Sequence, residues 1–220
     1  MPVAAALRKD LEETAERLEG PLAGEVKVSI HDIPTGLAAS VKGDRPGWAA
    51  SVIKLPVLVA AAREIEEGRM SLGETLLVDH RFVLDPMDAV SRLPAGTRLP
   101  VRDLLDHMIC ASDNEATNIL ADRIGIGRVN EVAWGLGLAR TMLGHLLCRG
   151  VPRHASAFNP DGSNVVTIQA YALSPVTSPF ERLYAMTPGR TRMNTGRILR
   201  NPAKMAPLRA WSRSLALKTR

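Results

Sequence analysis

Residues 48–58 read WAASVIKLPVL, and residues 110–120 read CASDNEATNIL. The first stretch places Ser51 three positions before Lys54, nearly one helical turn, so both side chains lie on the same face of a helix. The triplet SDN in the second stretch begins 61 positions after Ser51. A serine hydroxyl is a weak nucleophile until a base removes its proton, and a lysine amine can be that base when burial lowers its pKa. The two stretches therefore predict a serine nucleophile with a lysine beside it.

Helical and alternating patterns of apolar residues surround these two stretches. Asp113 is expected to cap a helix that Gly125 ends. Helices are expected over 3–19, 51–67, 101–110, 114–124 and 128–136, a strand hairpin over 25–33 and 37–42, and a loop over 69–100. Beyond residue 150, 165–173 fits a helix or a strand, 179–186 and 195–208 fit helices, and 214–219 fits a strand. This order predicts a mixed α/β chain.

The pairing of SxxK with SDN resembles the class A serine β-lactamases and the wider group of penicillin-recognising serine hydrolases. The resemblance covers residues 1–150, where the order of helix, hairpin, SxxK helix and SDN loop agrees. It implies an α/β (α+β) fold in which an antiparallel sheet flanked by helices adjoins an all-helical subdomain. We expect one domain over 1–220, with 1–48 and about 176–220 in the α/β part and 49–175 mainly helical. The family's last strands and C-terminal helix are expected to be missing.

The resemblance also implies roles for the residues of both motifs. Ser51 would be the nucleophile that attacks the lactam carbonyl, and Lys54 would be its base or would organise one. Ser112 would relay a proton to the leaving nitrogen. Asn114 would hydrogen-bond Lys54 and the amide of the ligand. No cofactor is implied, and the expected ligand is a β-lactam or a peptidoglycan-like peptide.

Two further features of the family are altered in this sequence. The family's KTG motif holds the substrate carboxylate, and Lys218 and Thr219 would take that role here, but Arg220 follows in place of glycine. Residues 141–167 contain no glutamate for deacylation, and their one carboxylate is Asp161, in the turn-like NPDGS. A truncated or frame-altered product, divergence, or a second chain that supplies the strands in a homo-oligomer or strand-swapped dimer would each explain the C-terminal departures.

Three functions therefore follow as alternatives. The first is a β-lactamase-like hydrolase that acylates Ser51 and then hydrolyses the acyl-enzyme, the activity behind antibiotic resistance. The second is a penicillin-binding or esterase-like protein that acylates but barely deacylates. The third is a non-catalytic remnant that works as a binding module. A plainer interpretation of the motifs themselves is that Ser51 caps a helix, Lys54 is solvated, and the SDN triplet is a turn.

Composition excludes several other classes of protein. The chain has 220 residues, of which 45% are hydrophobic, but no apolar run reaches the roughly 18 residues that span a membrane. Charges throughout 2–19 argue against a secretory signal, so we expect a cytoplasmic protein as written, or a periplasmic or secreted one if a signal has been removed. Neither CxxC nor HExxH is present, so no metal site is expected. Cys110 is expected to be a small buried hydrophobe.

Charge is unevenly distributed along the chain. Residues 1–150 hold 17 Lys and Arg against 21 Asp and Glu, whereas residues 151–220 hold 11 against 2. A basic tail of this kind can bind nucleic acid or an anionic membrane surface. Its arginines alternate with prolines and lack interleaved aromatic residues for base stacking, so no nucleic-acid partner is expected.

Overall fold

A computed structural model describes residues 2–22, 24–32, 35–81, 88–147, 156 and 159–167. The chain divides into two compact units, Met1–Pro179 and Phe180–Arg220, and every described residue belongs to the first unit. The elements predicted over 179–186, 195–208 and 214–219 lie outside the described residues. Within the described residues, no helix combines the length and the apolar character needed to cross a membrane.

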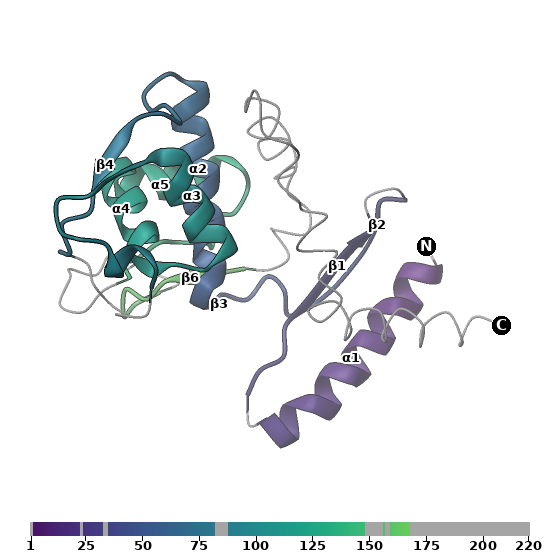
Figure 1. Cartoon of the computed structure of the whole chain (residues 1–220). Coiled ribbons are helices and arrows are strands. Elements are labelled where there is room, and N and C mark those ends of the chain that lie inside the picture. Colours follow the sequence, from purple (N-terminus) through teal and green to yellow (C-terminus); the bar gives the residue numbers. More distant parts are fainter. Residues whose placement is uncertain are drawn as a thin grey trace, which may run out of the picture. The chain divides into compact units, whose positions relative to one another are not determined.

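A long helix and a strand hairpin form the N-terminal part of the fold. Helix α1 (Pro2–Leu22) packs on strand β2 (Leu37–Val41), which pairs antiparallel with β1 (Val28–Asp32) (Figure 1). Glu19 near the end of α1 joins the two layers, because its carboxylate accepts hydrogen bonds from the backbone N–H of Val26 at 2.9 Å and from Lys42 Nζ at 2.5 Å. The helix and hairpin predicted for this region are confirmed.

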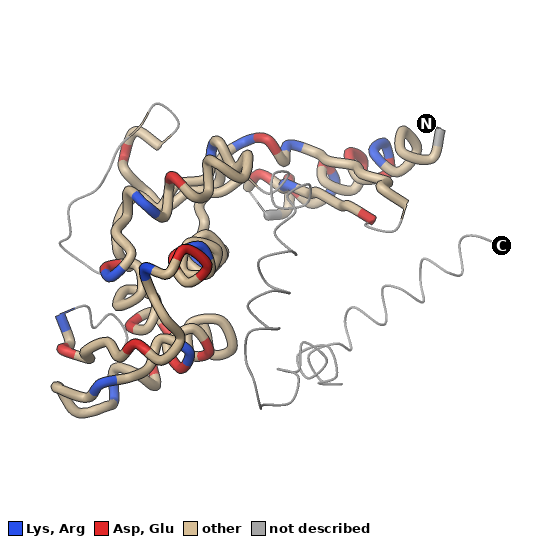
Figure 2. The backbone as a smooth tube through the Cα atoms, turned by 90° about the horizontal axis from the view of Figure 1, so that it is seen from above, with Lys and Arg blue, Asp and Glu red and all other residues tan. Residues whose placement is uncertain are grey.

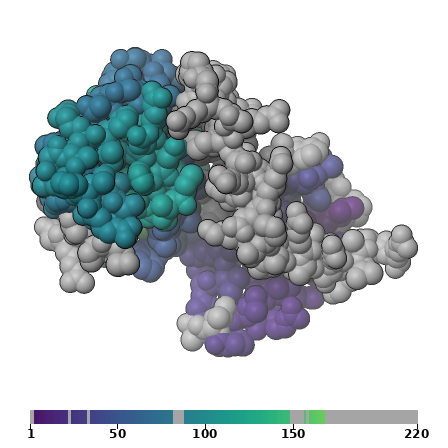
Figure 3. Space-filling view, viewed as in Figure 1, coloured from purple at the N-terminus to yellow at the C-terminus, as the bar shows by residue number. Residues whose placement is uncertain are grey.

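Four helices form the part of the chain that carries both sequence motifs. A short 3₁₀ turn (Ala50–Ile53) leads into α2 (Lys54–Glu66), and α3 (Val101–Cys110), α4 (Asn114–Ile124) and α5 (Ile126–Gly135) follow. Helix α2 contacts α3, α4 and α5, and most of its residues are buried. The side chains coloured blue to teal pack closely on the face seen in Figure 3. All four helices were expected from the sequence, with boundaries within a few residues.

The beginning and end of α2 follow from local chemistry. Pro56 is the third residue of the helix, where its missing N–H removes no intrahelical hydrogen bond, so the proline is tolerated as expected. Gly68 has a φ of +73°, a left-handed conformation that favours glycine and ends the helical run. Alanines at 60–62 are buried and let neighbouring helices approach closely. These features set where α2 begins and ends and how closely its neighbours pack against it.

Two short strand pairings were not predicted, although a strand at 165–173 was one of two alternatives. Strand β4 (Thr75–Leu77) pairs antiparallel with β5 (Arg98–Pro100) inside the stretch expected to be loop. Strand β3 (Gly47–Trp48) pairs with β6 (Val165–Val166), so the strand alternative holds at the start of 165–173. The β3–β6 pair lies directly before the 3₁₀ turn that carries Ser51, and it therefore fixes the entry of the chain into the site.

One expectation about packing is wrong. Cys110 is exposed rather than buried. The buried face of α3 consists of Val101, Leu104, Leu105 and Met108, at the spacing of a helical stripe. Position 110 falls off this stripe, so the apolar sequence around the cysteine does not bury it.

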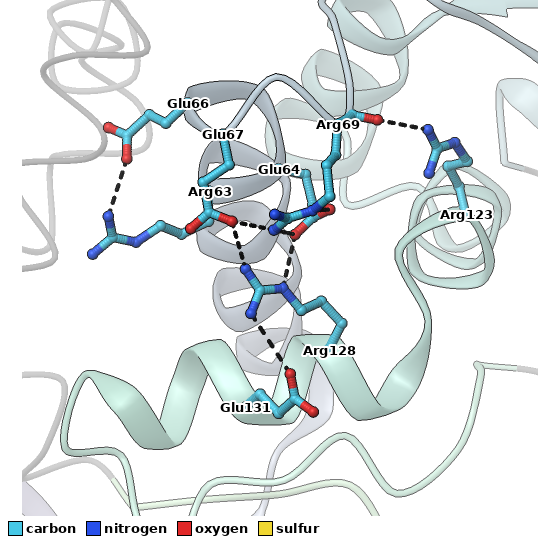
Figure 4. A network of polar contacts seen from close by, with 8 residues as sticks. All are labelled: Arg63, Glu64, Glu66, Glu67, Arg69, Arg123, Arg128 and Glu131. Carbon is cyan, nitrogen blue, oxygen red and sulfur yellow. Dashed lines mark hydrogen bonds and ion pairs between the residues drawn. The ribbon is translucent and has the colours of Figure 1, made fainter.

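Both signs of charge are interspersed along the described backbone (Figure 2). The most connected charged cluster ties the C-terminal end of α2 to α5 (Figure 4). Glu64 is its centre: its side chain is only 7% exposed and accepts hydrogen bonds from Arg69 at 2.6 and 2.7 Å and from Arg128 at 2.8 Å. The hydrogen bonds from Arg69, opposed by burial and helped by the hydrogen bond from Arg128, lower the pKa of Glu64 from 4.5 to about 2.

Replacing Glu64 by Gln should destabilise the protein at neutral pH by about 1–3 kcal/mol, because a buried, charge-assisted contact is lost. Since the folded pKa is depressed, the wild-type advantage should be present above pH 4.5 and disappear as the pH falls towards 2. Urea unfolding at several pH values measures this difference. Glu131→Gln is the matched control: that carboxylate is 65% exposed and 3.6 Å from Arg128, so its loss should change little. A deficit for Glu64→Gln that does not depend on pH would contradict the assignment.

Three buried asparagines hold the segment 141–147 against the rest of the described fold. Each side-chain amide hydrogen-bonds backbone groups of this segment, in the way that a neighbouring strand or helix turn would. Asn118 of α4 exchanges two hydrogen bonds with the backbone of Leu147, Asn130 of α5 does the same with Leu143, and Asn164 Oδ1 accepts from the N–H groups of Gly144 and His145 at 2.7 and 3.0 Å. Together with the antiparallel bridge between the backbones of Met142 and Val165, these hydrogen bonds fix the segment.

Gly144 lies where this segment approaches the turn before β6. A Cβ atom at position 144 would lie 2.2 Å from the carbonyl oxygen of Gly162 and 2.7 Å from that of Ser163. Because both neighbours are backbone atoms, we expect Gly144→Ala to destabilise the protein by about 2 kcal/mol or more. Gly135→Ala, at the end of α5 with no atom near the added methyl, should be neutral or slightly stabilising. Thermal unfolding of both variants measures the contrast, and equal melting temperatures would contradict it.

Candidate active site

Ser51 lies at the entrance to α2, within the 3₁₀ turn, and is exposed. The residue before it, Ala50, has a φ of +42°, an unfavourable left-handed conformation for an alanine. The preceding backbone is held by a hydrogen bond from the N–H of Ala49 to the carbonyl of Asn164, at 2.9 Å. Strain of this kind persists only where surrounding contacts enforce it, and it is frequent at functional sites. The β3–β6 pair and this hydrogen bond therefore hold Ser51 in its exposed position.

Lys54 is buried, with 2% of its surface exposed. Its Nζ donates to the carbonyl oxygen of Ser112, to Ser112 Oγ at 2.8 Å and to Asn114 Oδ1 at 2.9 Å. An ammonium group has three N–H donors, and these three oxygens satisfy all of them. Burial lowers the pKa of Lys54 below its usual value, while the negative charges of Asp88 and Asp113 act in the opposite direction.

Ser112 connects the lysine to Ser51. Its Oγ donates to Ser51 Oγ at 3.0 Å while accepting from Lys54, so a continuous hydrogen-bond chain joins Lys54, Ser112 and Ser51. Ser112 has a φ of +58°, and this left-handed turn ends the segment after α3 and directs the chain into α4. The structure thus brings together four of the six predicted site residues: Ser51, Lys54, Ser112 and Asn114. The other two, Lys218 and Thr219, lie outside the described residues.

The middle residue of the triplet is structural. Asp113 is 1% exposed and caps α4, as expected, by accepting from the N–H of Ala116 at 2.9 Å through Oδ1. Its Oδ2 accepts from the N–H of Val90, also at 2.9 Å. Asp113 therefore fastens the SDN triplet both to α4 and to the segment before α3.

Asp88 is a site residue that the sequence did not indicate. Its Oδ2 accepts from the backbone N–H of Asn114 at 2.9 Å, within the same residue whose side-chain amide receives Lys54. Neither the spacing of Asp88 from the triplet nor its neighbours in the sequence identifies it as part of the site. The contact depends on how the segment before α3 folds back on α4.

Asp161, in the turn-like NPDGS, makes hydrogen bonds within its own turn. Its Oδ1 accepts from the N–H of Ser163 at 3.1 Å, and its Oδ2 accepts from the hydroxyl of the same serine. This is an aspartate that stabilises its own turn. Across the part of the chain that the structure describes, no group of three or more His, Cys, Asp or Glu residues could hold a metal ion.

The geometry supports one kind of chemistry. An exposed hydroxyl on a constrained turn is linked to a buried amine through a second hydroxyl, and both hydroxyls can pass a proton. The N-terminal end of α2, where backbone N–H groups face outward, favours negative charge close to Ser51. The plainer interpretation of Lys54 as a solvated side chain is wrong, because Lys54 is buried and fully hydrogen-bonded.

The model of the Beta-lactamase enzyme family matches residues 7–185. A β-lactamase from Rhodobacter capsulatus is 32% identical over 115 residues, which cover 52% of this chain and 39% of that protein.

Solved structures share the fold. PBP-A is 25% identical with a TM-score of 0.58, over 77% of this chain and 63% of its own. The β-lactamase of Sphaerobacter thermophilus is 30% identical with a TM-score of 0.58, over 73% of this chain and 58% of its own. A mutant of PBP-A, solved as an acyl-enzyme complex with penicillin G, has a TM-score of 0.63 at 24% identity, over 85% of this chain and 71% of its own. This chain therefore spans about two fifths of the Rhodobacter enzyme and about three fifths of the first two solved relatives. Since the family model covers most of its residues, the chain belongs to the β-lactamase enzyme family, with the β-lactamase fold predicted from its sequence.

Proposed function

We propose that this chain is a serine hydrolase of the β-lactamase type, which opens a β-lactam ring through an acyl-enzyme on Ser51. The observation that carries the proposal is the hydrogen-bond chain from Lys54 through Ser112 to Ser51. Membership of the family supports the reaction class, and the penicillin acyl-enzyme of the PBP-A mutant supports a β-lactam as ligand. A peptidoglycan-like peptide is the alternative ligand.

Acylation needs Lys54 in its neutral form. One N–H donor is then replaced by a lone pair, which can accept the Ser112 hydroxyl proton, while Ser112 Oγ accepts from Ser51. As Ser51 Oγ attacks the lactam carbonyl carbon, its proton passes through Ser112 to Lys54. When the carbonyl C–N bond breaks, Ser112 gives its proton to the leaving nitrogen and is reprotonated by Lys54. Water then hydrolyses the ester, which releases the opened product and restores Ser51.

A specific observation favours a second candidate, a penicillin-binding protein that acylates but barely deacylates. In the described parts of 141–167, the one carboxylate is Asp161, and both of its oxygens are engaged with Ser163 in its own turn. No residue of these segments is therefore assigned as the base for hydrolysis of the ester. A mutant of the solved relative PBP-A was captured as an acyl-enzyme complex with penicillin G.

Intact-protein mass spectrometry over time, after mixing with penicillin G, tests the proposal. Wild-type protein should gain the mass of one penicillin molecule. Because the nucleophile is gone, Ser51→Ala should form no adduct, and its rate of penicillin consumption should fall by at least about 10³-fold. Ser29→Ala, which removes a hydroxyl from strand β1, is the matched control and should behave as wild type.

The time course separates the candidates. A transient adduct with consumption of penicillin supports the hydrolase, and a persistent adduct with little consumption supports the penicillin-binding alternative. No adduct and no consumption by wild-type protein would contradict both and favour the non-catalytic remnant. Equal activity in Ser51→Ala would contradict the assignment of the nucleophile.

A further inference from the structure

The hydrogen-bond partners of Lys54 are all uncharged. A carbonyl oxygen, a hydroxyl and an amide oxygen receive its three donors, so no carboxylate among the described residues accepts from the buried ammonium. A buried charge without a counter-charge is unfavourable, because desolvation is not offset by attraction. The balancing charge must therefore come from groups one step further from Nζ.

Two carboxylates act on Lys54 from that distance, Asp88 and Asp113. Both oxygens of Asp113 are engaged in fastening backbone N–H groups, as the cap of α4 and as the partner of Val90. Asp88 is joined directly to the residue that holds the lysine: its Oδ2 accepts from the Asn114 N–H at 2.9 Å, and Asn114 Oδ1 accepts from Lys54 Nζ at 2.9 Å.

Other titratable groups lie close to these aspartates. Glu115, the next residue on α4, is fully buried, and neither of its carboxyl oxygens has a hydrogen-bond partner. Burial raises the pKa of Glu115, which favours its neutral form, while the neighbouring His80 lowers it and Asp113, Asp79 and Asp88 raise it further. The charges that act on Lys54 are those of Asp88 and Asp113, and Glu115 is not among them.

We propose that Asp88 is a positioning residue of this site, whose carboxylate holds the Asn114 backbone and supplies negative charge that balances the Lys54 ammonium. The inference rests on the proposed function for its effect on catalysis, but not for its effect on the lysine itself. Because the carboxylate stabilises the charged lysine, Asp88 limits the fraction of Lys54 that is neutral at a given pH. Its loss should therefore move the pH dependence of acylation.

Asp88→Asn separates charge from hydrogen bonding, since the asparagine Oδ1 can still accept from the Asn114 N–H. With the negative charge removed, the titration midpoint of Lys54 should fall by about one pH unit. The acid limb of the acylation rate with penicillin G should move to lower pH by the same amount. Asp122→Asn makes the same charge change at a carboxylate that is 44% exposed and pairs with Arg81, and it should move neither.

Two readouts test the inference: the ¹³C-lysine NMR titration of the free protein, with the Lys54 signal assigned by its absence in Lys54→Met, and the pH profile of penicillin acylation. An unchanged Lys54 midpoint in folded Asp88→Asn overturns the proposal. If Asp88→Asn does not fold, Asp88→Glu, which keeps the negative charge, is the deciding variant. An unchanged titration midpoint of Lys54 in Asp88→Glu supports the proposal, and a Lys54 midpoint lowered by a full pH unit overturns it. If wild-type protein shows neither a penicillin adduct nor consumption of penicillin, the proposed function alone is contradicted, because the titration of the free protein still decides the role of Asp88.

Discussion

The burial of the Lys54 ammonium is the constraint on which the described site depends. An amine removed from water must find a partner for each N–H group, and here all three partners come from the SDN triplet, which lies far along the chain. The lysine therefore docks the start of α2 against the start of α4. The same contacts place the Ser112 hydroxyl within 3.0 Å of Ser51, so one arrangement serves both folding and chemistry.

The surrounding elements hold this arrangement from several sides. Ala50 and Ser112 both have positive φ values, and each adjoins or forms part of the hydrogen-bond chain. Their unfavourable conformations are maintained by contacts that do not belong to the reaction, including the β3–β6 pair and the cap at Asp113. At the opposite end of α2, Glu64 and its arginines fasten the helix to α5. The first helix of the site is thus fixed at both ends.

Local signals predicted the helices, because residues that start and end a helix can be recognised in the sequence: Asp113 as the N-cap and Gly125 at the end define α4 without reference to the rest of the chain. The three-residue strands β4 and β5 escaped prediction, since neither has enough alternation to stand out from a loop and each depends on its partner. The resemblance carried by SxxK and SDN implied the contact between Lys54 and Asn114 that the structure has. The role of Asp88 could not be predicted from the sequence for a physical reason. Its contact with Asn114 is made by an irregular segment whose path depends on tertiary packing.

The central claim is that Lys54 and Ser112 act on Ser51 as one unit. A double-mutant cycle tests it most directly, with the acylation rate constant for penicillin G measured by stopped-flow for wild type, Lys54→Met, Ser112→Ala and the double variant. If Lys54 is absent, Ser112 has no base to which it can pass the proton, so its further loss should cost little. The acylation rate of the double variant should therefore lie within a few fold of that of the slower single variant. Rate losses that multiply in the double variant would show two independent contributions and would contradict the relay.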